Sequence, residues 1–146
     1  MFVVDTNVLV YAADQAAEEH ARCRQLVEGW RAQVLPWYTT WSVFYEFLRV
    51  STHPRVFRRP WTAGAAWRFV ESLVASPGLG ILVETSRHLE VAAMTVAEIP
   101  GLRGNLWHDA RTAVLMREHG LTRSYTRDQD FHRFPFLEVI DPLTDC

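Results

Sequence analysis

Short apolar runs alternate with amphipathic stretches along this chain. The apolar runs are short enough to be buried strands, and they lie at residues 2–4, 34–37, 81–83, 121–125 and 139–140. Between them, apolar side chains recur at the three- and four-residue spacing of helices, at residues 7–13, 18–32, 40–51, 63–75, 87–97 and 106–119. Strands that alternate with helices of this length predict an α/β fold with a central parallel sheet of four to five strands, flanked by helices.

Breaks in this pattern predict where elements end. Pro54 and Pro60 follow the helix at 40–51 and predict a basic loop over residues 53–60. Gly120 follows the last helix, where glycine commonly ends a helix. No repeat, low-complexity segment or long linker divides the chain, so residues 1–146 are predicted to form a single domain.

The composition is that of a globular protein, with 49% hydrophobic and 22% charged residues. No apolar stretch approaches the roughly 18 residues that span a membrane. The first apolar run is interrupted by Asp5 and has no basic leader, so neither a membrane segment nor a signal peptide is expected. Cys23 and Cys146 form neither a metal-binding spacing nor a disulfide framework, which favours a cytoplasmic protein.

The formal net charge is −2, and all 15 basic residues are arginine. Five of the 17 acids are the site candidates described next, so the other 12 face 15 arginines. A mildly basic surface around an acidic site slightly favours a polyanionic substrate.

Four separated carboxylates lie in or against apolar segments. Asp5 ends the first strand, Glu46 lies within an apolar helix, and Asp109 lies near the start of the last helix. Asp128 follows the fourth strand, with Asp130 beside it. Because ligands of open α/β sheets bind beyond the carboxyl ends of the strands, we expect Asp5 and Asp128 at one rim. Buried acids are usually paired or bind a metal, so convergence of these groups would create an oxygen-lined site for a hard divalent cation.

Each acid also has a structural interpretation. Asp5 can cap the helix that follows it, and Asp109 lies where the helix dipole favours negative charge. Arg49, three residues further on, can neutralise Glu46. The last two acids are common turn residues. Their joint occurrence, in an order that the topology brings together, favours a functional site.

These motifs resemble those of PIN-domain ribonucleases, specifically the VapC-type toxins of bacterial toxin–antitoxin pairs. The resemblance runs essentially from end to end and rests on four segments in order, Asp5-Thr6-Asn7-Val8-Leu9, Glu46-Phe47-Leu48-Arg49-Val50, Arg103-Gly104-Asn105-Leu106-Trp107-His108-Asp109-Ala110 and Thr126-Arg127-Asp128-Gln129-Asp130-Phe131. Each segment alone is a short pattern, but four in this order at full domain length are highly specific. The resemblance implies a PIN-like fold and a metal-dependent endoribonuclease.

The resemblance also implies roles for individual residues. The catalytic acids that would bind Mg²⁺ or Mn²⁺ are Asp5, Glu46, Asp109 and Asp128, with Asp130 as an auxiliary ligand. The polar residues that would orient these acids are Thr6, Asn7 and Thr126. A metal-activated water would then hydrolyse a phosphodiester bond of RNA. The division of labour between the last two acids stays open, and Arg127 and Gln129 are interpreted as ordinary variation.

The resemblance further implies a homodimer and a cognate VapB-type antitoxin whose C-terminal segment occludes the acidic site. The basic residues that would contact RNA phosphates are Arg49, Arg55, Arg58 and Arg59, of which the last three also suit a solvated loop. Residues that suit either the core or an exposed surface for partners are Trp61, Trp67, Phe69, Val70 and Leu73.

Two other functions compete with a ribonuclease toxin. Another metal-dependent phosphoesterase, such as a haloacid-dehalogenase-like phosphatase, would begin with strand-Asp-x-Asp, whereas this chain has Asp5-Thr6-Asn7. A non-catalytic module that binds RNA or protein would not need four acids, and all four are present. Cleavage of single-stranded DNA and the number of metal ions stay open.

Overall fold

A five-stranded parallel sheet forms the centre of the computed structural model, which describes residues 1–144. The strands are β1 (Val3–Val4), β2 (Trp37–Thr39), β3 (Leu79–Ile81), β4 (Arg123–Tyr125) and β5 (Glu138–Ile140). Their order across the sheet is β3-β2-β1-β4-β5, and every neighbouring pair is parallel. The predicted α/β fold with a parallel sheet of four to five strands is therefore confirmed. Cys146 lies outside the described residues.

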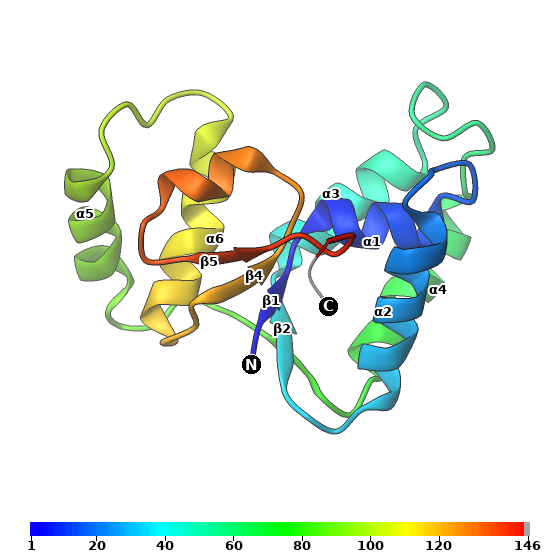
Figure 1. Ribbon diagram of the computed structural model, residues 1–146, viewed down its shortest axis with the longest axis horizontal. Coiled ribbons are helices and arrows are strands. Elements are labelled where there is room, and N and C mark those ends of the chain that lie inside the picture. The colour runs from blue at the N-terminus through cyan, green and yellow to red at the C-terminus, as the bar shows by residue number, and fades with distance from the viewer. Residues whose placement is uncertain (145–146) are drawn as a thin grey trace.

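Helices cover both faces of the sheet. They are α1 (Thr6–Ala13), α2 (His20–Ala32), α3 (Trp41–Ser51), α4 (Ala63–Val74), α5 (His88–Glu98), α6 (Leu106–Glu118) and the 3-10 helix η1 (Gln129–Arg133). Figure 1 shows α1, α2 and α4 on one side of the strands, and α5 and α6 on the other. Within the described residues, no helix is both long enough and apolar enough to cross a membrane.

The central strand β1 contributes to both layers of the core. Val4 packs into the larger core cluster with side chains such as Phe44, whereas Val3 packs with Leu115 and Met116 of α6. Both valines are fully buried. Burial of such a side chain contributes about 1.5–3 kcal/mol to the free energy of folding. Because successive side chains of a strand point to opposite faces, these two residues hold β1 between the layers. Asp5, the next residue, is thereby held at the carboxyl end of the central strand.

Polar caps define where several helices begin. The side chains of Thr40 and Thr62 accept hydrogen bonds from the backbone N–H three residues further on, at 3.1 Å in both cases, and they start α3 and α4. Gly120 has a φ of +69°, a left-handed conformation that favours glycine, and follows α6 as predicted.

Two strands lie off their predicted positions. The strand predicted at 34–37 begins three residues too early, because β2 begins only at Trp37. Val34 is exposed, and Pro36 has no N–H to donate to a neighbouring strand. The strand predicted at 81–83 lies two residues too late. Its register is set by pairing with β2 rather than by its own apolar run.

Candidate metal centre

The carboxyl ends of β1 and β4 bring Asp5 and Thr126 together. The two strands are parallel neighbours, with Val4 opposite Tyr125. The backbone N–H of Asp5 donates to the carbonyl of Tyr125 at 3.1 Å, so the pairing continues one residue past β1. Asp5 and the segment that carries Asp128 therefore lie at the same rim of the sheet, as the topology predicted.

Three donors hold the carboxylate of Asp5. Oδ1 accepts the backbone N–H of Thr6 at 2.7 Å, and Oδ2 accepts the side-chain amide of Asn7 at 2.9 Å and the hydroxyl of Thr126 at 2.7 Å. The oxygen of Thr126 also accepts the Asn7 amide at 2.9 Å and the backbone N–H of Asp128 at 3.0 Å. The residues predicted to orient the acids thus include two side chains that contact Asp5. Thr6 contacts Asp5 through its backbone.

Three carboxylates form a compact group beside this network. Oxygens of Asp109, Asp128 and Asp130 all lie within 4.8 Å of one another. Asp109 comes from the first turn of α6, and the other two flank the start of η1. The backbone N–H of Asp130 donates to Oδ1 of Asp128 at 2.9 Å, which starts η1. The sequence predicted only a loop here, but this cap and the burial of Phe131 favour one short helical turn.

Glu46 lies on an exposed face of α3, outside the group of three carboxylates. Its side chain is 48% exposed and pairs with Arg49 at 3.4 Å, the partner that the sequence offered as an alternative. The sequence placed Glu46 within an apolar helix, but α3 is not apolar on all sides. Only one side of the helix is buried, by Val43, Phe44 and Phe47.

The pKa values of two acids show that the negative charges interact. Burial raises the pKa of Asp109 to about 7, and so do the charges of the other acids, Asp128, Asp5, Asp130 and Glu46. Burial also raises the pKa of Asp5 to about 6, against the hydrogen bonds from Thr126 and Thr6 that lower it. Two carboxylates about 4 Å apart repel by roughly 4 kcal/mol at an effective dielectric constant near 20. A divalent cation would relieve this repulsion.

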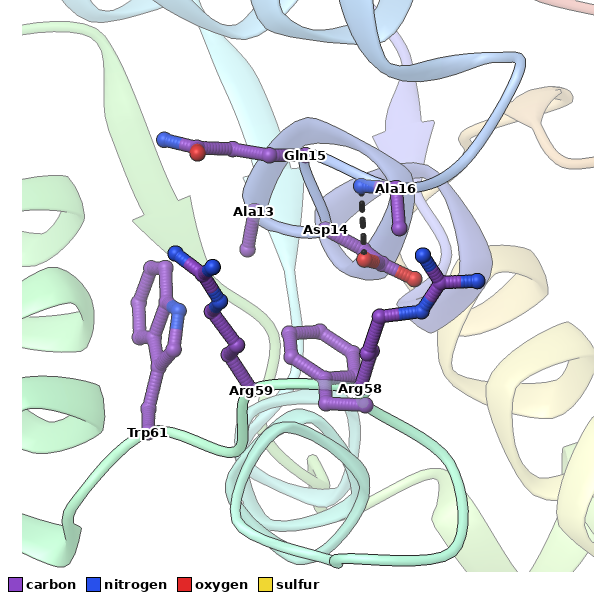
Figure 2. A pocket seen from close by; sticks show the side chains of 8 residues that line it. Ala13, Asp14, Gln15, Ala16, Arg58, Arg59 and Trp61 are labelled. Atoms are coloured by element: carbon purple, nitrogen blue, oxygen red, sulfur yellow. Dashed lines mark hydrogen bonds between the residues drawn. The ribbon is translucent and has the colours of Figure 1, made fainter.

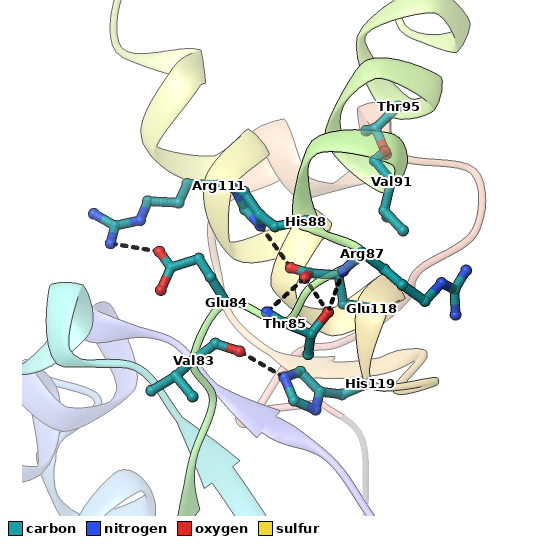
Figure 3. A network of polar contacts seen from close by, with 10 residues as sticks. All are labelled: Val83, Glu84, Thr85, Arg87, His88, Val91, Thr95, Arg111, Glu118 and His119. Atoms are coloured by element: carbon teal, nitrogen blue, oxygen red, sulfur yellow. Dashed lines mark hydrogen bonds and ion pairs between the residues drawn. The ribbon is translucent and has the colours of Figure 1, made fainter.

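The far end of α6 is held by a buried carboxylate, Glu118. Its side chain has no exposed area and accepts hydrogen bonds from Nδ1 of His88 at 2.7 Å and from the N–H and hydroxyl of Thr85 at 3.0 and 2.8 Å (Figure 3). Although burial raises the pKa of Glu118, these hydrogen bonds hold it below its usual value. The network fixes α6 to the connection between β3 and α5. The orientation of the helix that carries Asp109 therefore depends on contacts that the sequence pattern did not reveal.

Comparison with known proteins places the chain in a family. The sequence profile of the PIN domain matches residues 2–137. Ribonuclease VapC48 of Mycobacterium tuberculosis is 32% identical over 140 residues, which cover 96% of both chains. The chain belongs to the VapC ribonucleases of the PIN-domain family. The predicted family is thus confirmed.

Two solved structures share the fold of this PIN domain. The crystal structure of Mycobacterium tuberculosis VapC20, described as a sarcin-ricin loop cleaving toxin, has a TM-score of 0.66 at 20% identity and covers 97% of this chain and 100% of its own. VapBC2 from Rickettsia felis, bound to a DNA fragment from its promoter, has a TM-score of 0.64 at 15% identity and covers 95% and 96%. At these identities the two structures support the fold alone, and the fold is PIN-like, as predicted.

A hollow of about 440 Å³ lies on another part of the PIN domain, between the end of α1 and the loop after α3 (Figure 2). Its lining residues are Ala13, Asp14, Gln15, Ala16, Phe57, Arg58, Arg59 and Trp61. None of the five candidate acids lines it. Two of the arginines predicted to contact RNA thus lie at this hollow, whereas Arg49 lies beside Glu46. Their contact with RNA stays a prediction.

The apolar residues that suited either core or surface are divided between the two. Val70 and Leu73 are buried in the core. Trp67 is 41% exposed and stacks on Trp41, with ring centroids 6.5 Å apart and an interplanar angle of 15°. Together with Tyr45, which is 63% exposed, these two tryptophans form an aromatic patch on α3 and α4.

Proposed function

We propose that residues 1–146 form a single PIN domain that acts as a divalent-metal-dependent endoribonuclease, the toxin of a toxin–antitoxin pair. The observation that carries this proposal is the group of Asp109, Asp128 and Asp130, whose oxygens lie within 4.8 Å of one another. Membership of the VapC ribonucleases supports RNA as the substrate. The charges of the other four predicted acids all raise the pKa of Asp109, which favours a shared site over separate structural roles.

The donor set fits a hard cation, because carboxylate oxygens are the ligands that Mg²⁺ and Mn²⁺ prefer. The residues that would hold the ion are Asp109, Asp128 and Asp130, with Asp5 and Glu46 as further acids of the site. A bound ion would supply positive charge for the phosphodiester and lower the pKa of a water molecule.

The residues of the chain itself would organise this chemistry. Thr126 and Asn7 hold Asp5 in one orientation through their hydrogen bonds. Asp109, with a pKa of about 7, would release its proton near neutral pH as a cation binds. Arg49 is 66% exposed on the same helix as Glu46 and would contact a phosphate of the approaching RNA.

A cognate VapB-type antitoxin is the proposed protein partner. The Rickettsia felis structure is that of a VapBC pair, which supports a partner of this kind. The C-terminal segment of this antitoxin would occlude the acidic site. The hollow of Figure 2, lined by apolar side chains and by Asp14, Arg58 and Arg59, would dock a second segment with apolar and acidic side chains. Charge reversal of both arginines should weaken capture of a small protein encoded beside this one, while far-ultraviolet circular dichroism stays unchanged. Undiminished capture would exclude the hollow as the docking site.

A homodimer is proposed through the aromatic patch of Trp41, Tyr45 and Trp67. Exposed apolar patches of this kind favour association. Trp67→Arg should lower the molar mass measured by light scattering from dimer to monomer. A wild-type monomer, or a variant that remains a dimer, would contradict this assignment. Action in the cytoplasm stays a prediction from the cysteine usage.

The proposed activity is tested by mapping the ends of fragments in total RNA. Wild-type protein with Mg²⁺ or Mn²⁺ should produce defined cuts that EDTA abolishes, and Asp109→Asn should produce none. If neither protein cuts RNA, a non-catalytic RNA- or protein-binding module is favoured. Hydrolysis of small phosphate esters without RNA cleavage would favour another class of phosphoesterase. A single-stranded DNA substrate in parallel distinguishes the two nucleic acids.

A further inference from the structure

Arg127 lies between two residues of the candidate site, yet its side chain pairs elsewhere. Its guanidinium contacts Glu19 with an N–O distance of 2.9 Å and Asp141 with one of 3.4 Å. Its side chain is 34% exposed, and those of its partners are 21% and 29% exposed. Its backbone N–H donates to Oδ1 of Asn7 at 3.1 Å. This residue therefore joins the segment after β4 to two other parts of the chain.

The two carboxylate partners of Arg127 lie on two segments that contact each other. Glu19 immediately precedes α2, and Asp141 immediately follows β5. Nε of Arg22, on the first turn of α2, donates to the carbonyl of Pro142 at 3.1 Å. The start of α2 and the segment after β5 thus form one support, to which Arg127 attaches. Neither Glu19 nor Asp141 is among the candidate metal ligands.

The neighbours of Arg127 face the acids. Thr126 donates to Asp5, and the backbone at Asp128 is extended, with φ −78° and ψ 116°. In extended backbone, alternate side chains point to opposite sides. The guanidinium contacts Glu19 and Asp141, whereas Thr126 contacts Asp5 and the carboxylate of Asp128 lies with those of Asp109 and Asp130.

We propose that Arg127 is a positioning residue for the metal site, and this rests on the proposed function. Its ion pairs with Glu19 and Asp141 hold the segment 126–128 in the register at which Thr126 meets Asp5 and Asp128 meets Asp109. Residues that orient ligands without touching the ion commonly change affinity or activity by about 10- to 100-fold when they are removed. Without the pairs, the segment keeps its hydrogen bonds to Asp5 and Asn7 but loses its attachment to Glu19 and Asp141.

The test compares Arg127→Met with Arg31→Met, both in the full chain. Arg31 is a matched control, because its side chain is also 34% exposed and pairs with a carboxylate, Glu28, at 3.0 Å on α2. The deciding quantity is the dissociation constant for Mn²⁺, measured by electron paramagnetic resonance on folded protein. We expect it to rise by about 10-fold or more for Arg127→Met and to stay within about twofold for Arg31→Met.

Hydrogen exchange in metal-free protein gives a second readout. The backbone amide of Asp128, which donates to Thr126, should exchange faster in Arg127→Met, whereas amides within α1 should not. Arg127→Lys, which keeps the charge but loses the planar fork, should recover part of the Mn²⁺ affinity. Wild-type affinity and wild-type exchange at Asp128 in Arg127→Met would overturn the proposal.

If Arg127→Met does not fold, the double variant Glu19→Gln, Asp141→Asn removes both charged partners instead. The same rise in the Mn²⁺ dissociation constant and the same faster exchange at Asp128 are then expected. Neither readout requires RNA cleavage. A wild-type protein that binds Mn²⁺ but cuts no RNA would contradict the proposed function. The role of Arg127 would then still be decided by the Mn²⁺ affinity of Arg127→Met. A wild-type protein that binds no Mn²⁺ would contradict both the proposed function and the proposed role of Arg127.

Discussion

The hydroxyl of Thr126 donates a 2.7 Å hydrogen bond to Oδ2 of Asp5, a residue 121 positions away in the chain. Thr126 is fully buried, and its oxygen also accepts two N–H groups, from Asn7 and Asp128. One hydroxyl therefore connects the end of the central strand to the segment that carries the last acids. Its removal would deprive a sheltered carboxylate of a donor and leave two N–H groups without this acceptor.

Thr126→Val, which keeps the shape of the side chain but removes the hydroxyl, should lower the free energy of unfolding by about 1–3 kcal/mol. It should also weaken Mn²⁺ binding, because Asp5 loses one of its three donors. Urea denaturation and Mn²⁺ titration measure the two effects. Thr95→Val is the matched control, since Thr95 is equally buried and donates to a backbone carbonyl at 2.8 Å in α5. Equal Mn²⁺ affinities of the two variants would restrict Thr126 to a role in stability.

Asp109→Asn should stabilise the metal-free protein. The carboxylate is half-buried and repelled by the other acids, as its pKa of about 7 reflects, and the neutral amide removes that repulsion. We expect the melting temperature in EDTA to rise by a few degrees. Glu71→Gln, on an exposed part of α4, should leave the melting temperature unchanged. A fall in the melting temperature of Asp109→Asn would mean that this carboxylate is favourable even without a metal.

The stability of the metal-free protein should decrease as the pH rises from about 4 to about 7. The pKa values of Asp5 and Asp109 are near 3.8 when unfolded and about 6 and about 7 when folded. In this window the folded chain holds more protons on these groups than the unfolded chain, so unfolding releases protons and a higher pH favours it. Glu118 gives a pH dependence of stability with the opposite sign. Because folding lowers its pKa, Glu118 stabilises the folded protein at higher pH, and this stabilisation is lost as the pH falls below about 4.5.

Urea denaturation in EDTA at about pH 5 and about pH 8 measures this decrease and stays above the range in which Glu118 titrates. Asp109→Asn should show a smaller decrease than the wild type. The same decrease in both proteins would mean that other groups cause the pH dependence.

Added Mn²⁺ should raise the melting temperature more at about pH 8 than at about pH 6, because the carboxylates must lose their protons before they bind a cation. At a free concentration of 100 times the dissociation constant, a single site stabilises by about 2.7 kcal/mol. Differential scanning fluorimetry with and without EDTA measures the shift. Asp5→Asn should reduce it, whereas Asp14→Asn, at the other end of α1, should not. A shift that is independent of pH, or unchanged in Asp5→Asn, would place the ion elsewhere.

Local sequence patterns were sufficient for most of the fold. The strand before Asp5 and the helix that begins near Asp109 follow from apolar spacing, since each spans only a few neighbouring residues. A parallel sheet then brings the ends of β1 and β4 to one rim, so that Asp5 and Asp128 could be expected together. The strand at 81–83 was misplaced because its register depends on pairing with β2, which no local pattern contains.

The sequence by itself determined the α/β architecture, the acids available to the site and the rim at which two of them meet, because those features follow from local periodicity and the direction of strands. Only the tertiary structure decided that Glu46 is exposed, that Thr126 supports Asp5, and that Arg127 pairs with Glu19, a residue 108 positions away. Polar contacts of this kind depend on distances of a few ångströms between segments remote in sequence, and these distances are set by the packing of the two helical layers on the sheet.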